Sequence, residues 1–175
     1  MGAVGVKLWY PGNTVQHAGI ILAVGGVANS AHHRLPGGQQ DYFSKSNLTQ
    51  SVTAVTADCL LVKKSIYQQV GGLDEENLQI AFNDVNFCLK ILELGLRNIF
   101  TLFTELYHHE SASRGYDTSE QKQLRLAKEE AYMWKRWGSI LENDPAYNPN
   151  LSIHQANFSL AFPLRIRPLD PNQLI

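Results

Sequence analysis

Carboxylate and imidazole side chains stand where expected strands and helices begin or end. Asp84 opens an expected helix, Asp58 lies within an apolar run, and His108 and His109 follow an expected strand. A carboxylate in a cleft can act as a general base and take a proton from a substrate hydroxyl. The same position also suits an ordinary first-turn acid, which the helix dipole stabilises. Both interpretations of Asp84 stay open on these residues alone.

The histidine pair offers one side chain to a site. Neighbouring residues on an extended chain face opposite ways, so either His108 or His109 can enter a given cleft. The residue that does so is a metal ligand, an acid–base group or a hydrogen-bonded strand end. Cys-x-x-Cys and His-x-x-x-His pairs are both missing, which disfavours zinc. A metal-dependent α/β hydrolase that uses Asp84 with this pair remains an alternative.

A short polar loop follows the histidines. Ser111, Ser113 and Arg114 can donate hydrogen bonds to phosphate, and an arginine can do so through two N–H groups. The same residues also make an ordinary turn. A serine nucleophile is not expected, because the chain has no Gly-x-Ser-x-Gly elbow.

Hydrophobic periodicity predicts alternating strands and helices. The expected strands cover residues 3–10, 14–23, 52–63 and 98–107, and the expected helices cover 65–70, 84–94 with Asn83 as cap, and 117 or 118 to 137. Residues 24–50 read as a long surface loop. The last helix presents an apolar stripe, namely Leu124, Ala127, Ala131 and Trp134.

This order predicts an α/β domain with a mixed sheet and flanking helices. Active sites in such folds gather at the carboxyl ends of strands, so Thr56 to Asp58, Asp84 and His108 should share one cleft. Five prolines after Asn143 predict an extended arm. We therefore divide the chain into a body, residues 1–143, and an arm, residues 144–175.

Composition narrows the class of protein. The 175 residues carry 15 basic and 16 acidic side chains, for a net charge of −1, which disfavours a nucleic-acid binder held by bulk charge. Two cysteines favour a reducing compartment. We expect no membrane span and no signal peptide. The expected location is cytoplasmic, including a peripheral position at the inner membrane face.

Several segments together resemble the carboxyl-terminal half of family 2 glycosyltransferases, in the family's order. They are Val4 to Leu8, Gln16 to Gly19, Val55 to Val62, Gly71 to Glu75, Phe82 to Leu89, Tyr107 to Gly115 and Asp144 to Leu151.

The resemblance implies a partial GT-A fold and an inverting transfer of a sugar from a nucleotide-diphospho-sugar to a glycan or lipid-linked acceptor. Asp84 matches the general base, and His108 matches a ligand of Mg²⁺ or Mn²⁺. The remaining matches are Thr56, Ala57, Asp58 and Asn83 on the acceptor side, and Ser111, Ser113 and Arg114 at the diphosphate.

The chain also departs from the family pattern. Asn83 stands where an acidic residue is usual, Met133 replaces the glutamine of the processive signature, and no Asp-x-Asp motif is present. We therefore expect a piece that lacks the nucleotide-binding half, which would supply the other metal ligands. Loss of that half should expose a sheet edge at residues 3–23 and favour a homo-oligomer. The alternative function is a non-catalytic binding or assembly module of the same fold.

Overall fold

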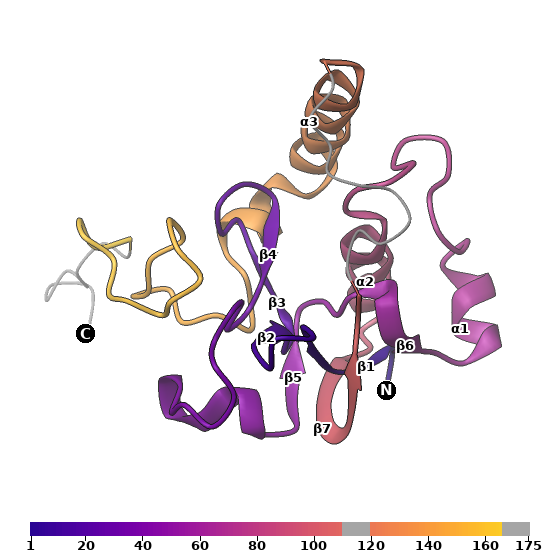
Figure 1. Ribbon diagram of the computed structural model, residues 1–175. Helices are drawn as coiled ribbons and strands as arrows, with labels where there is room; N and C mark the ends of the chain where they lie inside the picture. The colour runs from indigo at the N-terminus through magenta and orange to yellow at the C-terminus, as the bar shows by residue number, and fades with distance from the viewer. Residues whose placement is uncertain (110–119, 166–175) are drawn as a thin grey trace, which may run out of the picture.

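A curled mixed sheet lies at the centre of the computed structural model, which describes residues 1–109 and 120–165 (Figure 1). Its strand order is β2-β1-β7-β5, and β6 pairs with β1 beside β2. β3 and β4 form a separate two-stranded sheet. The strands are β1 (Val4–Trp9), β2 (Val15–His17), β3 (Ile20–Leu22), β4 (Ala28–Ser30), β5 (Gln50–Val52), β6 (Leu60–Leu61) and β7 (Asn98–Tyr107).

β1 and β7 form the parallel centre of this sheet, and β2, β5 and β6 join it antiparallel. Gly5 allows β1 to lie close to the chain at Val55, since a Cβ at Gly5 would stand 2.5 Å from the Val55 Cβ. The β1–β7 register jumps from Val6↔Thr101 to Lys7↔Glu105, which produces a bulge in β7. Beyond the bulge β7 pairs with β1 again, and the His108 N–H donates to the Trp9 carbonyl at 2.9 Å.

The predicted helices are confirmed in outline. They are α1 (Lys64–Gln69), α2 (Asn83–Glu93) and α3 (Glu120–Glu142), with short 3₁₀ helices η1 (Tyr42–Asn47) and η2 (Ala57–Cys59). α2 buries Val85, Cys88 and Leu89 in the main core, as its periodicity predicts. Its N-cap is Phe82 rather than Asn83, and Phe82 has a left-handed φ of 59°.

The predicted apolar stripe of the last helix is wrong. Leu124 is 59% and Trp134 39% exposed, and Ala127 and Ala131 are also exposed. The buried face instead consists of Glu129, Met133, Trp137 and Leu141. Helical spacing allows both stripes, and polar contacts favour the stripe that includes Glu129 and Trp137. Trp137 Nε1 donates to Asn86 Oδ1 at 2.9 Å, and the Glu129 carboxylate accepts N–H groups of the chain before α2.

Two other predictions about the strands are corrected. The expected strand at residues 52–63 is broken into β5, η2 and β6, because the Thr56 hydroxyl accepts the Asp58 N–H at 3.3 Å and starts a 3₁₀ turn. The expected strand at residues 14–23 forms the predicted hairpin only as β2. It then bends at Gly19, whose φ is +94°, and continues as β3 in the second sheet. Residues 24–50 contain β4 and η1 within the predicted loop.

Within the expected edge at residues 3–23, β2 does end the sheet path, but at Val15 its outer side pairs with the chain at Arg34 and Leu35. β1 has hydrogen-bonded neighbours on both sides, and the ends of the sheet path are the three-residue strands β2 and β5. Within residues 1–109 and 120–165, no helix has the length and apolar character that crossing a membrane requires.

The described part of the segment after α3 packs along the body. Tyr147, Leu151 and Phe158 bury against Ile21 and neighbouring residues in a second apolar cluster. The arm itself lies on the left of Figure 1. Asp144 fastens the start of the arm, because its carboxylate accepts from the N–H groups of Leu22 and Ala146, each at 2.8 Å, and from the Thr53 hydroxyl.

Candidate active site

Asp84 lies in the first turn of α2, and its carboxylate faces the turn of η2. Oδ1 accepts from the Val85 N–H at 2.8 Å, and Oδ2 accepts from the Ala57 N–H at 3.2 Å. Burial raises the pKa of Asp84, while hydrogen bonds from Ala57, Val85 and the Thr56 hydroxyl lower it and the charge of Asp58 raises it. The net upward shift brings this carboxylate closer to the range of a general base.

The chain before Asp84 is fixed by side chains from other elements. Glu129 of α3 accepts from the N–H groups of Ile80 at 3.1 Å and Ala81 at 3.0 Å. The Asn83 amide bonds the loop at residues 74–78, where it accepts from the Asp74 N–H and donates to the Leu78 carbonyl. Asn83 therefore stabilises the approach to α2, and its amide is engaged within the protein.

η2 connects Asp84 to His108. Asp58, on this turn, places Oδ2 3.4 Å from His108 Nδ1, and the same nitrogen lies 3.0 Å from Gln16 Oε1. The Gln16 oxygen is an acceptor, so Nδ1 carries the proton and Nε2 of a neutral ring keeps its lone pair. The side chains of Asp58 and His108 are 46% and 36% exposed, so this surface is open to solvent. His109 is exposed and takes no part in these contacts.

His17 is a site residue that the sequence reasoning missed. Its Nε2 accepts from the N–H groups of Gly19 at 3.3 Å and Thr56 at 3.4 Å. Burial lowers the pKa of His17 to about 3, so the ring is neutral. Nδ1 then carries the proton and faces Ser30 Oγ at 3.5 Å. The sequence signal that could have identified His17 is an imidazole inside the apolar stretch around Val15 and Ala18.

Five of the residues selected from the sequence thus meet in one series of contacts, namely Thr56, Ala57, Asp58, Asp84 and His108. Asn83 lies beside them but faces the 74–78 loop. Ser111, Ser113 and Arg114 lie outside the described residues. Among the side chains that the structure describes, no three His, Cys, Asp or Glu residues gather in a way that could hold a metal ion.

Two longer proteins are similar to this chain. It is 45% identical over 163 residues to uncharacterized protein y4gI of Sinorhizobium fredii, with 93% of this chain and 18% of that protein aligned. It is 34% identical over 175 residues to the O-antigen biosynthesis protein RfbC of Myxococcus xanthus, with 99% of this chain and 13% of that protein aligned. The chain thus spans less than a fifth of either relative. No protein-family model and no solved structure matches it.

Proposed function

We propose that this chain is the acceptor-side part of an inverting, GT-A type glycosyltransferase that acts in polysaccharide biosynthesis. Asp84 is the general base, and Thr56 to Asp58 form the acceptor wall. The observation that carries the proposal is the continuous contact from Asp84 through η2 to His108, on a surface open to solvent. The name of the Myxococcus xanthus relative supports the pathway, and the resemblance to family 2 supports the reaction.

In the proposed reaction, Asp84 takes the proton of the acceptor hydroxyl as the hydroxyl oxygen attacks the anomeric carbon of the donor. The bond from that carbon to the nucleoside diphosphate breaks, and the diphosphate leaves with its electron pair. The upward pKa shift suits this step, since a base whose pKa lies nearer the working pH transfers protons more efficiently. The N–H groups of Ala57 and Val85 fix the direction of the carboxylate.

Mg²⁺ or Mn²⁺ would supply charge stabilisation at the leaving diphosphate. Residues of this chain fit such an ion only in part. His108 offers Nε2, whereas the Asp58 carboxylate contacts the other ring nitrogen, Nδ1, so these residues supply far fewer than the roughly six ligands that such ions take. Gln16 holds the ring of His108 in the tautomer that a metal ligand needs.

The test is Asp84→Asn in the longest natural protein that contains this chain. Transfer from nucleotide-diphospho-sugars should fall by a factor of ~10² to 10⁴, because the amide cannot accept the proton, while donor binding stays unchanged. In the unsubstituted protein, the rate should rise with pH through the raised pKa of Asp84 and then level off. Glu142→Gln, the same change of carboxylate to amide at an exposed position far along α3, is the matched control.

Full turnover by the Asp84→Asn protein would contradict the assignment of the base. Absence of transfer in the unsubstituted protein, together with glycan binding, would favour the non-catalytic module instead.

A further inference from the structure

A cavity lies away from Asp84, between the loop at residues 32–42 and the arm. Its volume is about 390 Å³, and its lining includes His32, Arg34, Gln40, Tyr42 and Phe158. None of the residues that line it belongs to the contacts around Asp84. In Figure 1 the arm lies on the left, whereas β6, α1 and α2 lie on the right.

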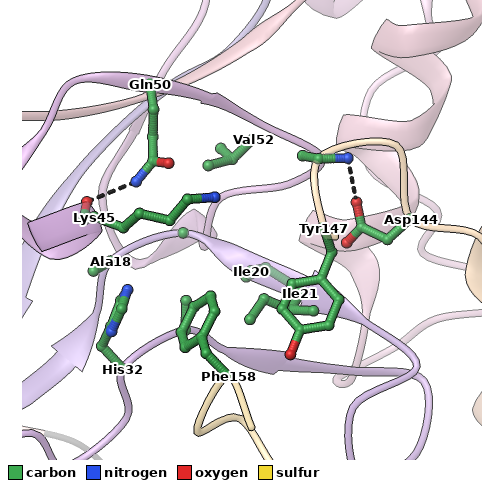
Figure 2. A pocket seen from close by; sticks show the side chains of 13 residues that line it. Ala18, Ile20, Ile21, His32, Lys45, Gln50, Val52, Asp144, Tyr147 and Phe158 are labelled. Atoms are coloured by element: carbon green, nitrogen blue, oxygen red, sulfur yellow. Dashed lines mark hydrogen bonds between the residues drawn. The ribbon is translucent and has the colours of Figure 1, made fainter. Parts of the chain in front are cut away.

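Three stacked rings form one wall of this cavity. Phe158 stacks on His32, with ring centroids 4.5 Å apart and planes 20° from parallel. Tyr42 stacks on the same phenylalanine, with centroids 5.0 Å apart and planes 10° from parallel. Figure 2 shows His32 and Phe158 close together in a smaller neighbouring cavity, into which the Lys45 side chain extends. Because Phe158 lies between the other two rings, both of its faces are covered, and only the outer faces of His32 and Tyr42 lie outside the stack.

The backbone around the stack adopts conformations that side-chain-bearing residues rarely use. His32, Arg34 and Phe158 line the cavity with φ values of 58°, 64° and 58°, and Phe43, which contacts Tyr42, has a φ of 54°. A left-handed backbone conformation costs free energy at a bulky residue, and residues in such conformations tend to cluster at ligand sites. Here it fixes the positions of the rings in the wall.

Asp41 adds a buried carboxylate to the same lining. Its side chain is 1% exposed; Oδ2 accepts the Ser46 N–H at 2.8 Å and lies 3.9 Å from His32 Nδ1. Oδ1 has no hydrogen-bond partner among the described residues. A buried oxygen without a donor is costly, and because Oδ1 is itself enclosed, a ligand hydroxyl satisfies it only when the Asp41 side chain turns toward the cavity.

From these features we infer that the cavity binds a pyranose ring of a glycan. The C–H face of a sugar packs on aromatic rings such as Tyr42, and its hydroxyls suit the carboxylate of Asp41 and the polar groups of Arg34 and Gln40. The buried carboxylate disfavours a nucleotide, whose phosphates it would repel. This inference rests on the proposed function and extends it: the acceptor is an oligosaccharide that the chain also holds at a sugar remote from the reacting hydroxyl.

The experiment is saturation-transfer NMR, which measures the saturation that passes from the 175-residue chain to each bound sugar. The panel consists of methyl hexopyranosides and methyl 6-deoxyhexopyranosides at millimolar concentrations. At least one glycoside should show transfer to its ring protons. Tyr42→Ala should weaken its binding ~10-fold, because it removes the stacking face, and Gln40→Ala at the exposed rim should weaken it ~3-fold. Phe103→Ala, which removes an exposed aromatic ring outside the cavity, should leave binding unchanged.

Gln40→Ala guards against loss of fold, since Gln40 is exposed. Uridine is tested alongside the glycosides. The inference would be overturned if no glycoside receives saturation, if Tyr42→Ala and Gln40→Ala both leave the transfer unchanged, or if uridine receives saturation and the glycosides do not. Asp84→Asn should bind the glycoside normally even though it should abolish sugar transfer. The two proposals therefore fail separately: loss of glycoside binding leaves the Asp84-dependent reaction standing, and full turnover by Asp84→Asn leaves the glycoside site standing.

Discussion

His17 shows how a buried imidazole can hold a turn in place through one ring nitrogen. Its Nε2 receives two backbone N–H groups, at Gly19 where the chain leaves the main sheet and at Thr56 where η2 begins. The edge of the ring also faces Phe100, at a centroid distance of 6.4 Å. Because the Thr56 hydroxyl and the Ala57 N–H both bond Asp84, His17 positions the turn that holds the proposed base.

The buried state of His17 predicts a specific loss of stability in acid. In the folded chain its pKa is about 3, whereas an unfolded histidine titrates near 6.5. Below pH 6.5 the unfolded state therefore binds a proton that the folded state does not, and the free energy of unfolding decreases as pH falls toward 3. Between pH 6.5 and 5 this contribution amounts to ~2 kcal/mol.

Chemical denaturation at pH 7, 6 and 5 measures this slope. His17→Gln keeps an acceptor for the two N–H groups but cannot titrate, so its stability should depend less on pH. Some slope should remain, because burial also lowers the pKa of His32, to about 4. If the substituted and unsubstituted chains lose stability in parallel, the neutral state of His17 is not the cause.

At the scale of elements, α3 positions the start of α2. Glu129 provides both oxygens to the N–H groups of Ile80 and Ala81, directly before the strained Phe82. These donors have no strand or helix of their own to pair with, so the loop depends on a side chain from α3. At this position, α3 therefore buries a charged side chain, that of Glu129.

Glu129→Ala should lower the free energy of unfolding by ~2–3 kcal/mol, because it leaves two N–H groups without their acceptors. Hydrogen exchange at Ile80 and Ala81 should accelerate more than exchange in β1 and β7. Lys128→Ala, at an exposed neighbouring position, should stay within ~0.5 kcal/mol of the unsubstituted chain. Unchanged exchange at Ile80 and Ala81 would show that α3 does not hold this loop.

The elements also show what local sequence can predict. α2 and β7 were predicted well, because each has a clear period and each ends near a marked change, such as Gly95 after α2. The region from β5 to β6 is also rich in β-branched and apolar residues. The expected strand nevertheless breaks at Thr56, whose hydroxyl accepts a hydrogen bond from the Asp58 N–H. Composition does not show that competition.

The arrangement of the candidate residues could be predicted only in part, for a related reason. Asp84 and His108 stand at element ends, where local patterns can find them. Gln16 and His17 act through contacts with residues 39 to 92 positions away, and no local pattern shows those partners. The buried face of α3 was missed in the same way, since Glu129 is chosen by backbone groups of a distant loop.

At the scale of the whole molecule, one carboxylate connects the two larger apolar clusters of the described residues. The main core lies between the sheet, α2 and α3, and the second lies between the arm and the chain around Ile21. Asp144 accepts hydrogen bonds from Leu22 of β3, from Thr53 after β5 and from Ala146 of the arm. Burial raises the pKa of Asp144, and these three donors lower it.

Asp144→Ala should therefore release the arm more than it loosens the sheet. The variant leaves the N–H groups of Leu22 and Ala146 without their acceptor and should cost ~3 kcal/mol in the free energy of unfolding. Thr53→Val removes one donor only and should cost ~1 kcal/mol. In hydrogen exchange, Tyr147, Leu151 and Ala161 should lose protection in Asp144→Ala, while the amides of β1 and β7 keep theirs, because the main core does not depend on the arm. Equal loss of protection in the arm and in β7 would mean that the two cores unfold as a single cooperative unit, and the Tyr42–Phe158 wall would then be part of the main fold instead of a separately fastened surface.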